Sequence, residues 1–138
     1  TMYRTESGEE RCVIDGHSHL WDGSPANQKN IPGKQFIEFL YAYHANLSPP
    51  EEKWSLEKFE KYDAKTMHDD LFINGYDDMA ILQPTYLSDF YNNGFNTTER
   101  NSALKKSHPE RFILTGAFDP RDGNKGLEDR HAKAEKYR

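Results

Sequence analysis

The stretch of sequence that decides the fold runs from Val13 to Asp22 and reads VIDGHSHLWD. Its start belongs to a short apolar run at 11–16, which Gly16 ends, and such a run is consistent with a buried strand. Two more runs of this kind occupy 79–84 (MAILQP) and 112–120 (FILTGAFDP). Apolar runs that are continuous rather than alternating are typical of parallel strands covered on both faces. The sequence therefore predicts three parallel strands.

Helical patterns separate and follow these strands. Apolar residues recur at helical spacing in the segments 34–46, 55–73 and 96–108. The segment 127–138 also has a helical pattern, but its apolar face is thin. Asn96 is the expected N-cap of the third segment, because Glu99 follows three residues later, as in a capping box. Strands that alternate with helices predict an α/β fold with a parallel sheet. We expect a flexible tail at 1–10 and one domain at 11–138 with a helical insertion at about 34–73.

The composition limits the class of protein. The chain has 138 residues and a net charge of -5. Because 13% of its residues are aromatic, we expect an ordered protein rather than a disordered one. Apolar residues, counted with Gly and without Tyr, make up roughly 36% of the chain, against about 45–50% in typical domains. We therefore expect something outside these residues to complete the core. Long basic runs, membrane-spanning apolar runs and a secretory signal are missing from the sequence, which argues against nucleic-acid and membrane partners. A cytoplasmic protein is the expectation.

The strongest chemical signal is the pair His17 and His19. Residues two apart on an extended segment point to the same side, so both imidazoles can reach one metal ion, and neutral imidazole suits Zn²⁺. The pair follows a buried strand, where α/β proteins place their sites. A catalytic metal site usually has three protein ligands, and the remaining histidines lie in predicted helices. The alternative interpretation is a pair of turn histidines that hydrogen-bond to their neighbours.

Polar residues also follow the other two predicted strands. Gln83 and Tyr86 come after the second strand, and Asp119 and Arg121 come after the third. Arg121 is a candidate for clamping a substrate carboxylate with its two-pronged guanidinium, and Asp119 for orienting it. Trp21 is a candidate for the wall of a substrate pocket. The competing interpretation is a surface turn at residues 119–123 and ordinary packing of the aromatic residues.

The segment from Val13 to Trp21 resembles the first-strand signature of the metal-dependent amidohydrolase superfamily. More narrowly, it resembles the amidohydrolase-2 branch, which includes aminocarboxymuconate-semialdehyde decarboxylase and related decarboxylases, hydratases and lactone hydrolases. The segments 80–84 and 108–121 resemble the stretches around the second and third strands of that branch. The resemblance implies the N-terminal part, about three β/α units, of a (β/α)₈ TIM barrel, with His17 and His19 as metal ligands. The barrel takes about 200 residues or more, and the catalytic residues of the family lie on later strands that this chain does not contain.

The function implied by this resemblance is that of a metal-dependent hydrolase or a non-oxidative decarboxylase (a lyase). Its substrate would be a small molecule that contains a carboxylate or carbonyl group, and its cofactor a divalent metal, Zn²⁺ first and Mn²⁺ second. Activity would need the remaining barrel segment or a second chain, in a homo- or hetero-oligomer, and the isolated chain is expected to be inactive. The alternative is a non-catalytic barrel remnant that acts as a binding or oligomerisation module.

Overall fold

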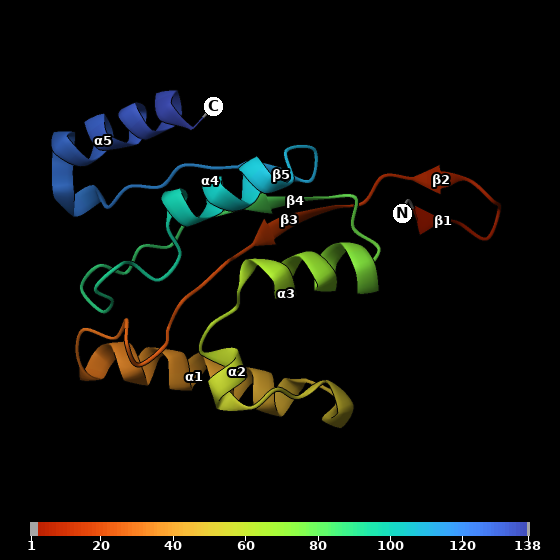
Figure 1. The fold of residues 1–138 in the computed structure, drawn as a ribbon, viewed down its shortest axis with the longest axis horizontal. Helices are drawn as coiled ribbons and strands as arrows, with labels where there is room; N and C mark the ends of the chain where they lie inside the picture. The colour runs from red at the N-terminus through yellow and green to blue at the C-terminus, as the bar shows by residue number, and fades with distance from the viewer. Residues whose placement is uncertain (1–2, 138) are drawn as a thin grey trace.

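A small parallel sheet lies at the centre of the molecule, for which the computed structural model describes residues 3–137 (Figure 1). Its strands are β3 (Ile14–Ser18), β4 (Met79–Leu82) and β5 (Phe112–Leu114), in the spatial order β3-β4-β5. Both pairings in this sheet are parallel. The prediction of three parallel strands is confirmed, although the first strand begins at Ile14 rather than at Arg11.

Strand β3 contains a register shift. Asp15 pairs with Ala80 and Ser18 pairs with Leu82, so three steps along β3 match two steps along β4. The side chains of a strand point to opposite faces in turn, so one extra residue reverses the alternation from that point onward. As a result Ser18 and Leu20 are the residues that become buried against the core, at 5% and 2% exposure.

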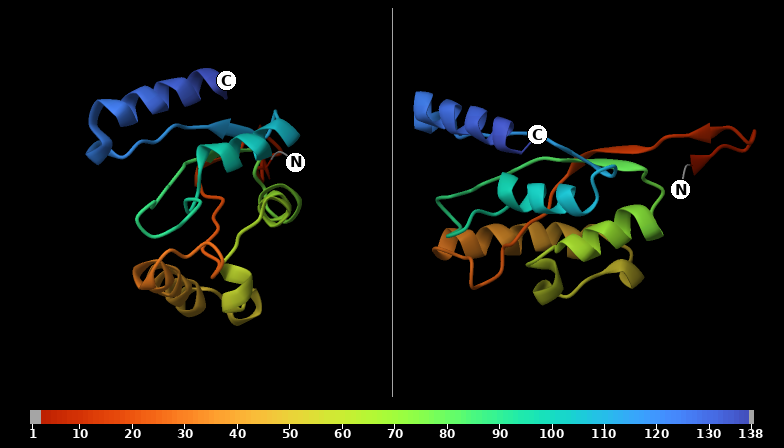
Figure 2. Two further views of the ribbon diagram at one scale, coloured as in Figure 1. Left: turned by 60° about the vertical axis from the view of Figure 1, so that its left-hand side comes forward. Right: turned by 45° about the horizontal axis from the view of Figure 1, so that its top comes forward.

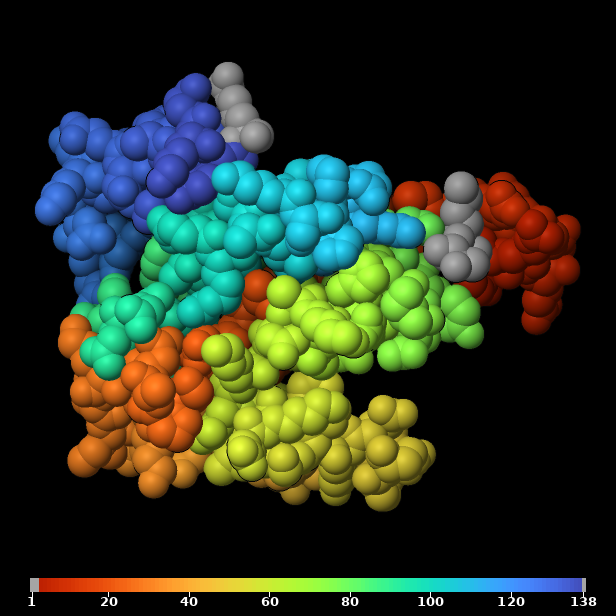
Figure 3. Space-filling view, viewed as in Figure 1, coloured from red at the N-terminus to blue at the C-terminus, as the bar shows by residue number. Residues whose placement is uncertain are grey.

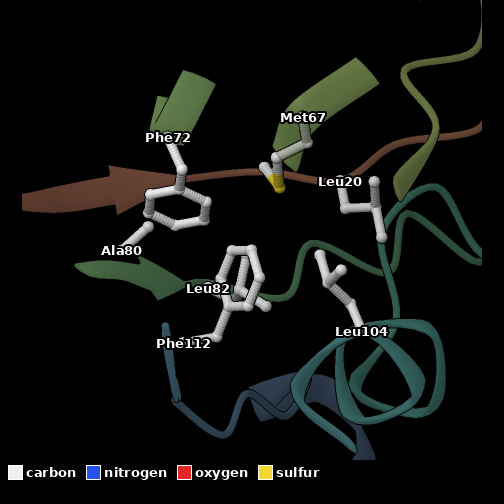
Figure 4. Packing of buried hydrophobic residues seen from close by; sticks show 7 residues of the cluster. All are labelled: Leu20, Met67, Phe72, Ala80, Leu82, Leu104 and Phe112. Carbon is white, nitrogen blue, oxygen red and sulfur yellow. The ribbon is translucent and has the colours of Figure 1, made fainter. Parts of the chain in front are cut away.

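The main core packs one face of the sheet against α3 (Ala64–His68), the π-helix η2 (Asp69–Asn74) and α4 (Thr98–Ser107) (Figure 4). The rings of Phe72 and Phe112 meet edge to face with their centroids 5.2 Å apart. Each fully buried side chain of this size contributes about 1.5–3 kcal/mol to folding. The buried members of this cluster are Leu20, Met67, Phe72, Ala80, Leu82, Leu104 and Phe112.

A second apolar cluster joins α1 (Ile31–Leu47), α2 (Leu56–Phe59) and the loop of residues 84–96. Its buried members are Ile37, Phe59, Tyr91 and Phe95. Figure 2 shows α1 and α2 together, away from the C-terminal helix α5 (Gly123–Lys136). The short 3-10 helix η1 (Pro50–Glu52) connects α1 to α2. Aromatic residues therefore hold this helical layer to the loop that follows β4.

Side-chain caps set where the helices begin. In each case an oxygen of the cap accepts a hydrogen bond from a backbone N–H of the first turn, which satisfies a donor that the helix cannot. The caps are Asn30 for α1, Ser55 for α2, Asp63 for α3 and Thr97 for α4. Asp63 starts a new helix inside the predicted segment 55–73, which is why that segment is not one helix. The cap of α4 is Thr97, so the prediction that Asn96 caps this helix is wrong.

A hairpin and a helix form the two ends of the described chain. At the start, β1 (Tyr3–Arg4) and β2 (Glu10–Arg11) form an antiparallel hairpin where a frayed tail was expected, and Arg4 pairs with Glu10 across it. Figure 1 shows this hairpin projecting from the rest of the molecule. At the other end, η3 (Pro120–Asp122) leads into α5, whose apolar face is thin as predicted, with Leu127 39% exposed.

The structure overturns the expectation of a barrel segment. A (β/α)₈ barrel closes its parallel strands into a ring, whereas residues 3–137 form an open three-stranded sheet and a separate two-stranded hairpin. The alternation of strands and helices that led to the barrel fits an open sheet equally well. One face of the sheet is also less covered than the apolar runs predict, because Ile14 is 48% and Ile113 40% exposed. The fold is mixed α/β with an open parallel sheet.

Candidate functional site

The two histidines of the first motif lie together at the carboxyl end of β3. Their ring centroids are 4.7 Å apart and the rings meet at 68°, edge to face. They follow the extra residue of β3, so they alternate with Ser18 and Leu20, whose side chains are buried. The prediction that both imidazoles come close to each other is confirmed by this distance.

Hydrogen bonds determine which nitrogen of His19 carries the proton. Nδ1 of His19 lies 2.8 Å from the backbone oxygen of Gln83. A carbonyl oxygen can only accept, so Nδ1 carries the hydrogen and the lone pair is on Nε2. Histidines that bind metals typically donate their other ring N–H to a carbonyl or carboxylate in this way, which fixes the orientation of the ring.

Gln83 and Asp15 support the backbone next to the histidines. The side-chain Nε2 of Gln83 donates to the oxygen of Gly16 at 3.0 Å, at the register shift of β3. The carboxylate of Asp15 accepts from the backbone N–H of His17 at 2.9 Å and from the hydroxyl of Ser18 at 2.6 Å. Gln83 was predicted to bind substrate, and its amide group is engaged with β3 in this structure.

An open pocket of about 360 Å³ adjoins the histidine pair. Its lining residues come from β3 and the segment that follows it, from the layer of α1 and α2, and from α3 and η2; Figure 3 shows a notch between the layer of α1 and α2 and the helix α3. Trp21 stacks on Tyr62 with centroids 4.8 Å apart, and its indole N–H donates to the oxygen of Phe59 at 2.8 Å. The aromatic side chains Trp21, Trp54, Phe59 and Tyr62 give the pocket a flat, mostly apolar wall. Trp21 is thus next to His17 and His19, where the sequence analysis expected a substrate-binding residue.

A third histidine, His44, also lines this pocket, but its ring nitrogens already have partners. Nε2 of His44 accepts from the backbone N–H of Trp54 at 2.8 Å, so Nδ1 carries the proton and donates to the hydroxyl of Ser48 at 3.0 Å. Elsewhere, the rings of His68 and His108 pack against each other at a tilt of 34°, with centroids 4.4 Å apart. Within residues 3–137, His, Cys, Asp and Glu form no group of three or more that is arranged to hold a metal ion.

The other predicted substrate residues meet in a separate pocket of about 370 Å³, beyond the ends of β4 and β5. Tyr86, Asp119 and Arg121 line it together with Lys133. The guanidinium of Arg121 donates to Asp119 and, at 2.7 Å, to Asp89, so its two prongs are engaged. The hydrogen bonds from Arg121 lower the pKa of the Asp119 carboxyl. This pocket and the histidine pocket have no lining residue in common.

Lys133 links helix α5 to this second pocket. Its ammonium group contacts Asp129 at 2.9 Å and Glu99 at 3.3 Å, and it donates to the hydroxyl of Tyr86 at 3.1 Å. Burial disfavours the charged form of Lys133, but the partners Asp129 and Tyr86 outweigh it and raise its pKa. Tyr86 in turn donates to Thr98 at 2.9 Å. Both cations that line this pocket, Arg121 and Lys133, are therefore already paired with carboxylates.

Sequence reasoning missed several residues around the histidines. Trp54, Phe59 and Tyr62 lie far from the motif in sequence, and only the high aromatic content hints at an aromatic pocket. Asn96 contacts the carbonyl that orients His19, yet its pattern with Glu99 indicated a helix cap. Contacts of this kind depend on the packing of the loop that follows β4, which no local pattern encodes.

Comparisons with known proteins give no relative for this chain. No protein-family model matches it, and neither the curated proteins nor the solved structures contain a match. Among residues 3–137, no helix has the length and apolar character needed to cross a membrane.

Proposed function

We propose that this chain supplies two imidazole ligands to a divalent-metal centre of the amidohydrolase type, which hydrolyses or decarboxylates a small carboxylate or carbonyl compound. The observation that carries the proposal is the contact between the rings of His17 and His19, with Nδ1 of His19 held by the carbonyl of Gln83. The aromatic pocket beside the pair offers space for the apolar part of a small substrate. The resemblance of residues 13–21 to the amidohydrolase-2 signature is a second, independent support.

The side chains present fit a metal ion in type but not in number. Two neutral imidazoles suit Zn²⁺, with Mn²⁺ as the alternative, whereas a catalytic zinc site usually takes three protein ligands and one open position. Within residues 3–137 no third ligand joins the pair. We therefore infer that a second polypeptide, or a further part of the protein, supplies the rest of the ligand set, and that this chain alone is inactive.

The residues of this chain have distinct roles in the proposed site. A bound divalent ion supplies a Lewis acid for a carbonyl or carboxylate group and lowers the pKa of water at the site to about 7. Gln83 holds His19 through its backbone oxygen, and Asp15 holds the backbone of His17. Trp21, fixed by its bond to Phe59, provides a flat surface against which a substrate packs. Arg121 lines the separate pocket beyond β4 and β5 and takes no part in this site.

A cytoplasmic location is part of the same proposal. Cys12 is exposed and free, and exposed free thiols are kept reduced in the cytosol. The aromatic and apolar lining of the site, together with the net charge of -5, favours a small organic substrate over nucleic acid.

One observation favours a second candidate function. Ile14 and Ile113 are about half exposed on the strands at the two edges of the sheet. Exposed apolar side chains on open edge strands promote association between chains. In this alternative the chain is a non-catalytic binding or oligomerisation module, and the two histidines only stabilise the end of β3.

Metal titration of the native complex, this chain together with the partner that completes the site, separates these candidates. Zn²⁺ is added to the metal-free complex in competition with a chromogenic chelator, for the wild type and for His17→Ala, His19→Ala and the control His131→Ala, whose residue is exposed on α5. We expect one Zn²⁺ per complex in the wild type and in His131→Ala, and loss of stoichiometric binding in the other two. Stoichiometric Zn²⁺ in His17→Ala would overturn the proposal.

Analysis of the native material tests the inferred partner. Intact mass and elemental analysis are measured together on the protein purified without tags or chelators. A second polypeptide with about one Zn per complex supports the metal enzyme. A single, metal-free species that self-associates supports the oligomerisation module instead.

A further inference from the structure

Asn96 is buried at the centre of the contacts behind the histidine pair. Its side chain is 0% exposed. Its backbone is held from both directions, because Asn96 N–H donates to the oxygen of Thr85 at 2.9 Å and Thr85 N–H donates back to Asn96 at 2.8 Å. This two-residue bridge fixes the position of Asn96 relative to the segment that follows β4.

The side-chain amide of Asn96 has one orientation that fits its neighbours. Nδ2 donates to the backbone oxygen of Gln83 at 2.6 Å and lies 3.4 Å from Nδ1 of His19. Reversing the amide would place its oxygen against the oxygen of Gln83 at the same short distance, with two acceptors facing each other. The observed orientation leaves Oδ1 buried without a hydrogen-bond partner among residues 3–137. A buried acceptor without a partner is unfavourable, so the donor at Nδ2 determines how this amide is placed.

The oxygen of Gln83 thus receives two donors, Nδ1–H of His19 and Nδ2–H of Asn96. The structure assigns to Asn96 the role of a positioning residue: by holding the Gln83 carbonyl in place, it keeps His19 in the tautomer whose Nε2 lone pair is available to a metal ion. The part of this inference that concerns metal binding rests on the proposed function. The part that concerns the tautomer of His19 does not.

We expect removal of the Asn96 side chain to weaken metal binding strongly, although Asn96 itself does not contact the ion. Groups that orient a metal-binding histidine through its second nitrogen typically change metal affinity by about 10–100-fold when they are removed. Without Asn96, the Gln83 carbonyl keeps one donor and gains freedom to move. The ring of His19 then samples more than one orientation and tautomer, and Nε2 is presented to the ion for less of the time.

The chain contains a matched control for this test. Asn101 on α4 is 1% exposed, and neither polar atom of its side chain has a partner among residues 3–137. Asn96→Ala and Asn101→Ala therefore remove the same buried amide, but only the first change touches the Gln83 carbonyl. A purely structural role for Asn96 predicts that the two variants behave alike.

The experiment has two readouts, one on the metal-free chain and one on the native complex that completes the site. Long-range ¹H–¹⁵N NMR of the metal-free chain reports the tautomer of neutral His19, and competition with a chromogenic chelator reports the affinity for Zn²⁺. We expect Nδ1–H alone in the wild type and in Asn101→Ala. In Asn96→Ala we expect a mixture of tautomers and a 10–100-fold weaker affinity for Zn²⁺. If Asn96→Ala does not fold, Asn96→Leu, which fills the space without a donor, is expected to give the same result.

The outcomes separate this inference from the proposed function. Pure Nδ1–H and unchanged Zn²⁺ affinity in the folded Asn96 variant would overturn the positioning role, as would an Nε2–H tautomer in the wild type. A mixture of tautomers in Asn96→Ala, combined with no Zn²⁺ binding by any variant, would support the positioning of His19 and overturn the metal centre.

Discussion

Replacing Gly33 with alanine has two opposite effects on stability at the start of α1. Helix propensity favours alanine over glycine by about 0.8–1 kcal/mol. The position does not accept a side chain, however, because a Cβ atom at Gly33 would lie 2.4 Å from the backbone oxygen of Phe90. Since the obstructing atom belongs to the backbone, rotation of a side chain cannot relieve the contact. The helix and the loop of residues 84–96 must move apart.

The cost of this separation follows from the contacts that cross it. Overpacking of this kind costs about 1–3 kcal/mol. The hydroxyl of Tyr91 donates to the oxygen of Gly33 at 2.7 Å, and weakening this buried bond costs about 1 kcal/mol more. After the gain in helix propensity is subtracted, we expect Gly33→Ala to lower the free energy of unfolding by roughly 1–3 kcal/mol.

Urea unfolding followed by tryptophan fluorescence and circular dichroism measures this change. Gln35→Ala is the control, because Gln35 is exposed on the same helix and its replacement should alter stability by no more than about 0.5 kcal/mol. A Gly33→Ala protein as stable as the wild type, or more stable, would show that propensity wins and that the contact with Phe90 is loose. The inferred link between α1 and the loop that carries Asn96 would then be wrong.

Two further predictions concern the same loop. Burial, with a smaller effect of Glu60, raises the pKa of Tyr91 from 10.0 to about 12. The unfolded state therefore ionises first, so this stabilisation is present below about pH 10 and falls by roughly 2 kcal/mol by pH 12, as urea unfolding at pH 9–12 would show. Tyr91→Phe should reduce this alkaline loss but not abolish it, since the pKa of half-buried Tyr62 is raised as well. An unchanged loss would contradict the assignment. Thr97→Val keeps the shape of the side chain but removes the oxygen that accepts from Arg100 N–H, and should lower the free energy of unfolding by about 1 kcal/mol in the same assay. Equal stability of this variant would mean that α4 does not depend on its cap.

The parallel strands were predictable because their signal is local. The runs at 79–84 and 112–120 each begin with an uninterrupted apolar stretch, MAIL or FIL, and that stretch forms a strand of the sheet. The closure of a sheet into a barrel is a property of all its strands together, so three runs could not establish it. The hairpin of β1 and β2 was missed because its strands have two residues each, with exposed polar side chains.

The candidate site was predictable in part for the same reason. On an extended segment, the spacing of His17 and His19 is enough to place two imidazoles on the same side of the chain. Whether Tyr86 and Arg121 join them depends on where the loops after β4 and β5 turn, and in the structure they line a separate pocket. The role inferred for Asn96 depends on the contact of His19 and Asn96 with the backbone oxygen of Gln83. The local sequence pattern of each segment does not encode this contact.

The register shift in β3 has a consequence for how this motif is recognised in other sequences. A His-x-His pair keeps its internal spacing whichever side of the strand it occupies, but its side depends on the number of residues that precede it in the strand. Ser18 pairs with Leu82 only because the register shift takes up one residue after Asp15; with regular pairing from Asp15 onward, the same letters would place His17 opposite Leu82, on the core side, and turn Ser18 and Leu20 away from the core. Two chains could thus share the motif letter for letter while one binds an ion and the other only packs, and the difference would be a single step in the pairing of the strand.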